Sequence, residues 1–327
     1  FACSDIRRRA AGGYWSREWL MRIIVTGGAG FIGSNIVNRC NDLGHETAII
    51  DNFVTGRRAN LDPRAKLYEV DITDRQALQQ VFEDFRPQIV DHHAAQIDVR
   101  KAVADPAFDA GVNVLGGLNV VQAAMSVGIE KFIYASTGGA VYGNPEVIPC
   151  TEDHPIRPIS PYGVSKHVLE HYLELYRILD GLTYTVLRYA NVFGPRQDPK
   201  GEAGVNAIFT GMMLAGERPT IFGKGDKTRD YVYVGDIVEA NMLALERGAG
   251  EIVNIGTGVQ TTDQEVYDAI AAAVGYTEPP LYTEERKGEV RHIALDASKA
   301  KSVLGWEPKV SFREGARLTV EYNRTQV

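Results

Sequence analysis

Short apolar runs alternate with longer amphipathic segments along the chain from Met21 onward. Residues 22–26 are rich in β-branched side chains, which is typical of a strand buried on both faces of a parallel sheet. Further strands are predicted at residues 46–50, 67–70, 88–91, 131–135 and 182–188. The segments between them predict helices at residues 31–43, 74–85, 113–126 and 162–179. Strands that alternate with helices indicate an α/β fold with a parallel, doubly wound sheet.

The pattern changes near Pro195, where glycine, proline and charged residues become denser and predicted strands become sparse. Helices are predicted there at residues 203–215, 234–247, 263–274 and 312–323. We therefore expect residues 21–194 to form the sheet domain and residues 195–327 to form mainly a smaller lobe, with some chain crossing back to the sheet. Residues 1–20 contain Arg7-Arg8-Arg9 but no apolar run of a signal peptide, and are expected to be a flexible N-terminal extension.

Composition and charge narrow the class of protein. The 327 residues are 44% hydrophobic and 24% charged, which is ordinary for a soluble globular protein. A net charge of −7 and a pI of about 5.6 give no electrostatic reason to expect nucleic acid as a partner. No apolar stretch approaches the ~18 residues of a membrane span. The three cysteines are widely spaced and form no metal or redox motif, which suits a reducing cytoplasm.

A glycine-rich turn follows the first predicted strand. Gly28-x-Gly30-x-x-Gly33 fits the dinucleotide-binding fingerprint of a Rossmann fold. Glycines at these positions allow a tight turn and let the backbone approach a pyrophosphate, which the N-terminus of the next helix attracts. A glycine turn without a ligand is the alternative, and the order strand, glycines, helix, strand and acid argues against it.

The acid in that order is Asp51, which ends the second predicted strand. A carboxylate there can bind both hydroxyls of the adenosine ribose and repels a 2′-phosphate. Arg57 and Arg58 follow in a loop and could instead hold a 2′-phosphate. The sequence favours NAD over NADP because the acid, not the arginines, lies at the end of the strand.

Tyr162 and Lys166 are four residues apart on a predicted helix, so their side chains lie on one face. A free tyrosine titrates near ~10, and a nearby ammonium favours the phenolate and lowers that pKa. The pair is therefore a candidate general base for a hydroxyl group. Pairs with this spacing are common on helix surfaces, where they are structural or solvated; the glycine motif in the same chain favours the catalytic interpretation.

From Met21 to the C-terminus the chain resembles the extended short-chain dehydrogenase/reductase family, and within it the nucleotide-sugar epimerases of the UDP-glucose 4-epimerase type. The motifs that carry the resemblance, in order, are Gly27-x-x-Gly30-x-x-Gly33, Asp51-Asn52, Asp71-Ile72, His92-x-Ala94-Ala95-Gln96, Ser136-Thr137 before Val141-Tyr142-Gly143, Tyr162-x-x-x-Lys166, Leu187-Arg188-Tyr189-x-Asn191 and Arg229-Asp230-Tyr231-Val232. The resemblance implies a Rossmann domain followed by a smaller substrate-binding lobe.

The resemblance also implies roles for individual residues. Tyr162 would take the proton of a sugar 4-hydroxyl while C4 gives hydride to NAD, and Lys166 would hydrogen-bond the nicotinamide ribose. Further cofactor contacts are implied for Gly27, Gly30, Phe31, Ile32, Gly33, Asp51, Asn52, Asp71, Ile72, Ala94 and Ala95. The nucleotide of the sugar substrate would be held by Asn191, Arg229, Arg286 and Glu289.

The catalytic hydroxyl departs from the family pattern. Many epimerases have Ser or Thr four residues before the tyrosine of Val-Tyr-Gly, and this chain has Gly138 there. We expect Thr137, one residue earlier, to serve, with Ser136 as the fallback and a purely structural hydroxyl as the alternative. Related dehydratases and decarboxylases carry acids after the hydroxyl residue; Gly138-Gly139-Ala140 has no titratable group, which argues for epimerisation.

His167 and His171 lie four apart on the Tyr162 helix, but no third metal ligand is evident. We expect no metal, and predict that this face, which also carries Glu170 and Glu174, is solvated or part of an interface. The same helix has more apolar residues than one stripe needs and should bury a second face. Because family members dimerise through this helix and the Asn113 helix, the resemblance implies a homodimer.

The expected activity is NAD-dependent epimerisation at C4 of a UDP-sugar, interconverting UDP-glucose and UDP-galactose through a 4-keto sugar. Within enzymes, the alternatives are a UDP-glucuronate 4-epimerase and a 4-ketosugar reductase with net hydride transfer. A non-catalytic NAD-binding sensor is the alternative outside enzymes, and it has no need for the hydroxyl of Tyr162. No nucleic-acid or membrane partner is expected.

Overall fold

The computed structural model describes residues 20–199, 204–285 and 290–326. Its centre is a seven-stranded, all-parallel sheet in the order β11-β6-β5-β4-β1-β2-β3. The strands are β1 (Arg22–Thr26), β2 (Glu46–Asp51), β3 (Lys66–Glu69), β4 (Ile89–His92), β5 (Lys131–Thr137), β6 (Tyr184–Tyr189) and β11 (Glu251–Ile255). This order is that of a doubly wound Rossmann sheet, so the predicted fold class is confirmed.

The seventh strand, β11, is one more than the sequence predicted. Its run of five residues lies between Gly250 and Gly256, in the part of the chain where the regular alternation of strands and helices has ended. It pairs in parallel with β6 and closes one edge of the sheet. The C-terminal part of the chain therefore contributes a strand to the central sheet.

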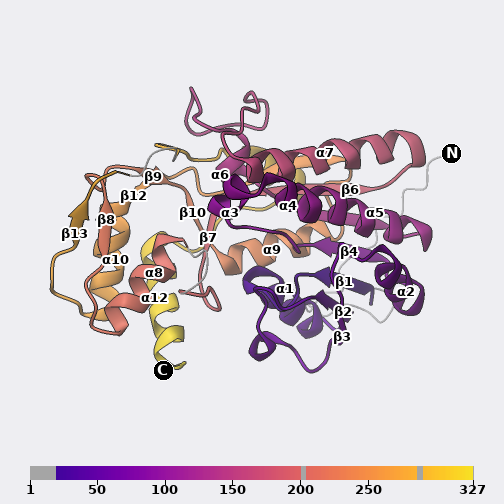
Figure 1. The fold of residues 1–327 in the computed structure, drawn as a ribbon, viewed down its shortest axis with the longest axis horizontal. Helices are drawn as coiled ribbons and strands as arrows, with labels where there is room; N and C mark the ends of the chain where they lie inside the picture. Colours follow the sequence, from indigo (N-terminus) through magenta and orange to yellow (C-terminus); the bar gives the residue numbers. More distant parts are fainter. Residues whose placement is uncertain (1–19, 200–203, 286–289, 327) are drawn as a thin grey trace.

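Helices cover both faces of the sheet (Figure 1). One face carries α1 (Phe31–Asp42), α9 (Val234–Ala244) and α11 (Ser298–Leu304), and the other carries α2 (Arg75–Phe85), α5 (Gly117–Ser126) and α7 (Pro161–Asp180). Asp74 caps α2 by accepting a hydrogen bond from Ala77 N, as its sequence position suggests. None of the described helices is long and apolar enough to cross a membrane.

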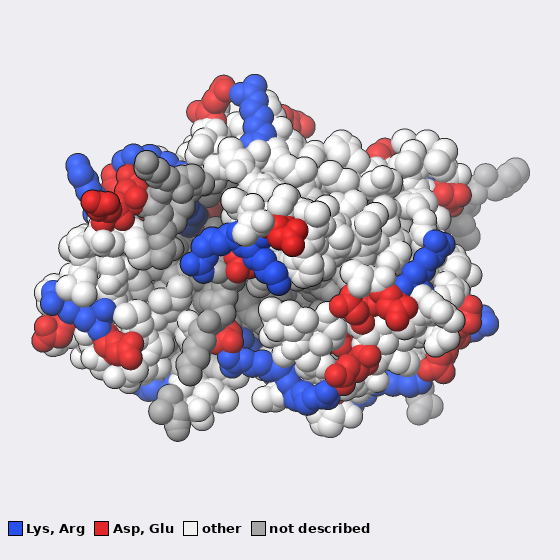
Figure 2. Space-filling view, viewed as in Figure 1, with Lys and Arg blue, Asp and Glu red and all other residues white. Residues whose placement is uncertain are grey.

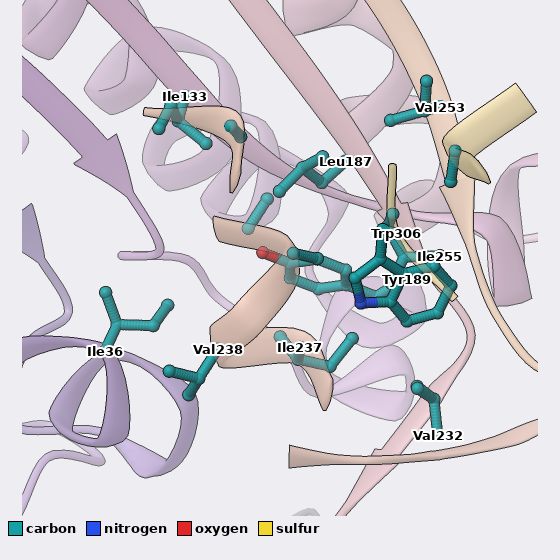
Figure 3. Packing of buried hydrophobic residues seen from close by; sticks show 14 of the residues in the cluster. Ile36, Ile133, Leu187, Tyr189, Val232, Ile237, Val238, Val253, Ile255 and Trp306 are labelled. Carbon is teal, nitrogen blue, oxygen red and sulfur yellow. The ribbon is translucent and has the colours of Figure 1, made fainter. Parts of the chain in front are cut away.

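Trp306 anchors the C-terminal part of the chain to the sheet. Its indole lies among Tyr189, Ile237 and Ile255 (Figure 3), and its Nε1 donates to Asp236 O at 2.8 Å. The indole is fully buried with its one donor satisfied, so it adds apolar burial without an unpaired polar group. Strands and helices from both parts of the chain share this core.

The single helix predicted at residues 113–126 is divided in the structure. The short helices α3 (Val99–Ala104) and α4 (Pro106–Ala110) lead into a π-helical segment, η3 (Gly111–Gly116), and then α5. Asn113 in this segment is buried and donates to Gln96 O and Ser165 Oγ. The π-helical turn thus joins the loop after β4 to α7, which is consistent with the frequent occurrence of π-bulges at functional sites.

The smaller lobe lies beside the sheet, at the left of Figure 1. Its helices α8 (Val205–Leu214), α10 (Asp263–Val274) and α12 (Phe312–Arg324) enclose a separate apolar core. Short strand pairs connect it to the sheet: β7 (Asn191–Phe193) with β10 (Tyr231–Tyr233), β9 (Thr228–Arg229) with β12 (Thr261–Thr262), and β8 (Thr220–Phe222) with β13 (Leu281–Thr283).

Candidate active site

The glycine turn lies at the carboxyl end of β1, where the strand order reverses between β1 and β4. Gly27 has a φ of +68°, and a Cβ there would lie 2.8 Å from Ala94 N. A Cβ on Gly33 would lie 2.3 Å from Gly27 O. Neither position tolerates a side chain, because backbone atoms already occupy the space.

The first turn of α1 is open to an anion. Gly30 is the N-cap, no side chain caps the helix, and no acidic residue lies in its first turn. The N–H groups that begin with Phe31 and Ile32 can therefore donate to a phosphate, reinforced by the helix dipole. This geometry fits the pyrophosphate of a dinucleotide such as NAD.

Asp51 is buried at the end of β2, beside the glycine turn. Its Oδ2 accepts from Ala29 N at 3.0 Å and its Oδ1 from Phe53 N at 2.8 Å. Burial raises the pKa of the carboxyl and the two backbone donors oppose that shift. Asn52 Nδ2 donates to Asp71 Oδ2 at 2.7 Å, so the two predicted cofactor motifs touch. Ile72, next to Asp71, is buried.

The two arginines that could have held a 2′-phosphate face carboxylates. Arg57 forms an ion pair with Asp198. Arg58 pairs with Glu69 at 2.6 Å, and its guanidinium lies 4.3 Å from the centre of the Phe53 ring. Because a carboxylate already pairs with each guanidinium group, the structure agrees with the preference for NAD over NADP.

The loop after β4 is held against β1 by Thr26. The Thr26 hydroxyl oxygen accepts from His93 N and Ala94 N, each at 3.1 Å, and lies 2.7 Å from His92 Nδ1. This places Ala94 and the following Ala95 beside the glycine turn. Burial lowers the pKa of His92, so its ring is neutral. His93 instead bonds Asp91 on the other side, and no group of three or more metal-binding side chains occurs among the residues described.

Tyr162 and Lys166 lie in the first turns of α7, whose N-terminus is capped by the Ser160 hydroxyl. Burial and the charge of Asp109 raise the pKa of Tyr162 to about 12, and a hydrogen bond with the Thr137 hydroxyl opposes this shift. In the protein alone burial dominates the phenol and the net shift of its pKa is upward, so the lowering by Lys166 stays a prediction. Burial also lowers the pKa of Lys166 to about 7.

The two candidate hydroxyls have different partners. Thr137 ends β5 beside Tyr162, and its hydroxyl lowers the pKa of the phenol. Ser136 is buried, and its Oγ donates to Glu170 Oε1 at 2.5 Å. A Cβ at Gly138 would lie 2.3 Å from Leu295 Cδ1, so a hydroxyl side chain at that position would collide with the core.

Asn191 joins this group from β7. A Cβ built on Gly139 would lie 3.4 Å from Asn191 Oδ1 and 3.8 Å from Thr137 Oγ1, so the loop of α6 (Gly138–Val141) lies between the two side chains. Arg229 Nη1 donates to Thr228 O at 2.9 Å. Arg286 and Glu289 lie outside the described residues.

Two acidic residues near the pair were not recognised as part of the site from the sequence. Asp109 on α4 is buried and raises the pKa of both Tyr162 and Lys166. Asp105-Pro106 is a helix-start signal that could have revealed α4. Glu170, assigned to a solvated or interface face, is instead buried against Arg188, with N–O distances of 2.6 and 3.0 Å.

A doubly wound sheet, an uncapped glycine turn and a Tyr/Lys pair with a neighbouring threonine define a dinucleotide-dependent enzyme of the short-chain dehydrogenase type. The profile of the NAD dependent epimerase/dehydratase family matches residues 23–256. The chain belongs to this family, and the resemblance to extended short-chain epimerases is confirmed.

Relatives with this fold are similar over nearly their whole length. UDP-glucose 4-epimerase from Thermotoga maritima, crystallised with UDP-glucose, is 50% identical with a TM-score of 0.92, covering 94% of this chain and 99% of that chain. The Thermus thermophilus enzyme, in complex with NAD, is 46% identical with a TM-score of 0.89, covering 94% and 100%. UDP-glucose 4-epimerase of Mycolicibacterium smegmatis is 44% identical, covering 94% and 99%.

Proposed function

We propose that this protein interconverts UDP-glucose and UDP-galactose by NAD-dependent epimerisation at C4 through a 4-keto sugar. The observation that carries the proposal is that Thr137, at the end of β5, lies beside Tyr162 and lowers the pKa of its phenol, at the carboxyl ends of the strands where the glycine turn also lies. The relatives named above, which are UDP-glucose 4-epimerases, support the choice of substrate. The lack of a titratable group at residues 138–140 argues against the dehydratase and decarboxylase chemistries.

In this proposal a bound NAD would supply a reversible hydride acceptor for C4, so that the reaction causes no net oxidation. Tyr162 takes the proton from the 4-hydroxyl and gives it back, and Thr137 hydrogen-bonds the same oxygen. Ser136 is the weaker candidate because its hydroxyl is already committed to Glu170. Lys166 would bind the nicotinamide ribose, and its ammonium would favour the phenolate of Tyr162 in the loaded site.

The cofactor would be held by the residues whose backbone and side chains line the turn. Gly27, Gly30 and Gly33 would admit the pyrophosphate, and Asp51 would bind the ribose of the adenosine. We assign Asn52, Asp71, Ile72, Ala94 and Ala95 to the remaining walls of the same site. Residues 21–194 would form the cofactor domain and residues 195–327 mainly the substrate lobe.

The nucleotide of the substrate would bind at the junction of the two parts. Asn191 and Arg229 lie on β7 and β9, and the planar fork of an arginine suits diphosphate oxygens. Arg286 and Glu289 are proposed from the family motif alone.

We further propose a homodimer that buries the outer face of α7 with the neighbouring η3 and α5. Ile178 and Leu179 are 64% and 67% exposed, and Leu115, Val164 and Leu175 are also exposed. Figure 2 shows a largely uncharged area over α7 and α5. Exposed apolar side chains grouped in this way mark an interface. Sedimentation of Leu179→Lys should show a monomer where the unchanged protein shows a dimer; a wild-type monomer contradicts the proposal.

A reducing cytoplasm remains the expected compartment, and the buried free thiols of Cys40 and Cys150 agree with it. Fractionation of cells that express the native gene, with immunodetection of the protein, would test this expectation.

The deciding experiment is product analysis by NMR. The purified protein is incubated separately with UDP-glucose, UDP-N-acetylglucosamine and UDP-glucuronate while absorbance reports NADH. Interconversion of two 4-epimers from UDP-glucose without net NADH is expected, and Tyr162→Phe should lower the rate by about 10²- to 10⁴-fold. Conversion of UDP-glucuronate alone, or net change in NADH, would replace the proposal with the corresponding epimerase or reductase. Binding of NAD without conversion would favour a sensor.

A further inference from the structure

A chain of buried polar side chains runs behind the Thr137–Tyr162 pair, and the roles proposed above do not use it. Ser136 Oγ donates to Glu170 Oε1 at 2.5 Å, and Glu170 accepts two hydrogen bonds from Arg188. Arg188 Nη1 donates to Tyr142 OH at 3.0 Å, and Tyr142 donates to Asn254 Oδ1 at 2.7 Å. These residues lie on β5, α7 and β6, in the turn after α6, and on β11. The chain therefore connects the elements that carry the site.

The central pair is fully charged and almost fully enclosed. Glu170 and Arg188 are 2% and 4% exposed. Burial alone would raise the pKa of Glu170, but hydrogen bonds from His167, Arg188 and Ser136 outweigh it and lower the pKa to about 2. Buried ion pairs commonly add little stability over apolar residues of the same volume, because desolvation offsets their attraction. Stability alone therefore does not explain why this pair is placed here.

Glu170 touches the site from two sides. On α7 it lies one turn after Lys166 and two turns after Tyr162, so the three share a face. On the sheet, Ser136 is in register with Arg188, and both meet the same carboxylate. Because Thr137 follows Ser136 directly, fixing the Ser136 side chain fixes the peptide that carries Thr137.

We propose that Glu170 is a positioning residue for the epimerase site: through Ser136 it sets the place of the Thr137 hydroxyl, and its buried charge, one helical turn from Lys166, favours the ammonium form of that lysine. The catalytic consequence of this inference rests on the proposed function, whereas the contacts of Glu170 do not depend on that function.

Acidic, aromatic and imidazole groups surround Lys166. Burial lowers the pKa of this lysine to about 7, and the charges of Glu170 and Asp109 oppose that shift. Its ammonium also lies 4.5 Å from the centre of the Tyr134 ring, and it faces the neutral His92. Glu170 itself is surrounded by Arg188, His167 and Ser136. Its charge contributes to raising the pKa of Tyr134 and of Tyr184. Removing Glu170 leaves Asp109 as the remaining acid that favours the ammonium.

The test compares Glu170→Gln with Glu174→Gln, one turn further along the same helix. Glu174 is partly exposed, pairs with Arg177 at 2.7 Å, accepts from Tyr184 OH at 2.9 Å, and is the matched control. Glu170→Gln should lower kcat by about 10- to 100-fold, with KM for UDP-glucose changed less than about threefold, because misplacing a reacting group affects the chemical step. The alkaline limb of the kcat profile should move down by about one pH unit. Glu174→Gln should change neither kcat nor the limb.

A variant without either charge separates positioning from folding. Glu170→Leu/Arg188→Met removes both partners, so its thermal stability should exceed that of Glu170→Gln while kcat stays low. If the pair were only structural, the double variant would regain wild-type kcat and pH profile, which would overturn the proposal.

A second readout does not depend on turnover. The Cε signal of ¹³C-labelled Lys166, identified by its loss in Lys166→Met, reports the titration of that lysine. Glu170→Gln should lower its pKa by about one unit in the NAD-bound protein. If this shift occurs in a protein that does not epimerise UDP-glucose, the proposed function fails and the electrostatic role stands. An unchanged Lys166 titration would refute that role even in an active epimerase.

Discussion

The glycine turn and the catalytic helix meet at one edge of the sheet, yet they are built in opposite ways. At the turn, position depends on atoms that are missing: a Cβ on Gly33 would lie 2.3 Å from Gly27 O. On α7, position depends on charged atoms that are present, since Glu170 is buried against Arg188 and Ser136. The first region should fail when an atom is added, and the second when a charge or hydroxyl is removed.

The largest effect is expected from an added methyl group at the turn. Gly33→Ala forces α1 away from Gly27, because the obstructing atoms belong to the backbone and cannot rotate aside. We expect loss of copurified NAD and a destabilisation of about 3 kcal/mol. Cofactor content after denaturation and urea unfolding measure these effects. Gly111→Ala is the control, since a Cβ there meets nothing within 4 Å. A stable, NAD-loaded Gly33→Ala protein would contradict the comparison.

The catalytic side should instead fail by loss of a hydroxyl. Thr137→Val preserves the shape of the side chain and removes the hydroxyl beside Tyr162, so kcat should fall by about 100-fold with NAD still bound. Thr137→Ser should retain most of the activity. Steady-state kinetics of UDP-galactose formation provide the measurement.

Moving the hydroxyl to the usual family position sharpens this prediction. Thr137→Val/Gly138→Ser should not recover activity, because the new side chain would point at Leu295, 2.3 Å from the built Cβ. Recovery in the double variant would show that the loop shifts and that Thr137 is not required.

Local patterns were sufficient for the turn but not for the network. The glycine spacing, the Asp74 cap and Asp51 at the end of a strand are each defined by a few consecutive residues, and the structure has them where the sequence put them. Glu170 and Glu174 are the same residue type and lie one helical turn apart, so the sequence alone does not distinguish them. Only the neighbouring strand β6 distinguishes them, because it buries Glu170 against Arg188 and leaves Glu174 partly exposed beside Tyr184.

The fold shows the same limit. The alternation of strands and helices defined the doubly wound sheet, but β11 joins it from residues 251–255, far along the chain from its partner β6. The pairing gives the backbone N–H and C=O groups of β6 hydrogen-bond partners on that side of the sheet. A short stretch of sequence cannot show that β6 needs such a partner. The π-helical segment η3 was likewise predicted as regular helix, because its apolar spacing alone does not reveal where Asn113 must reach Gln96 and Ser165.

A second buried charge lies at the opposite end of β5. Burial, and not an ion pair, dominates the environment of this residue. Lys131 is buried, donates to Arg247 O, and burial lowers its pKa to about 8. The unfolded chain therefore binds more protons than the folded protein between pH 8 and about 10.5, the pKa of a free lysine. Across that window the contribution of Lys131 makes the stability of the fold rise with pH. Below pH 8 the full free-energy cost of burying the charged lysine is present.

Lys131→Met should remove this cost at the loss of one hydrogen bond. We expect the variant to be more stable than the wild type by about 1–2 kcal/mol at pH 7, with the difference shrinking by pH 10. Urea unfolding at pH 7 and pH 10 measures both. Lys301→Met, which changes an exposed lysine paired with Glu307, is the control and should show no such dependence. A variant that is less stable at pH 7 would mean that the Arg247 contact outweighs desolvation.

The smallest effect is expected from the exposed charges beside the turn. Arg58→Ala removes an ion pair with Glu69 whose partners are both more than half exposed, so stability should change by less than about 1 kcal/mol. The preference for NAD over NADP should also stay, because it depends on the buried Asp51 and not on a guanidinium already facing an acid. Calorimetric titration of cofactor-stripped protein with each dinucleotide tests this, with Asp51→Ala as the variant that should lose the preference. If Arg58→Ala changed cofactor choice while Asp51→Ala did not, the discrimination would lie in the loop, and the turn would share the dependence on charge that distinguishes α7.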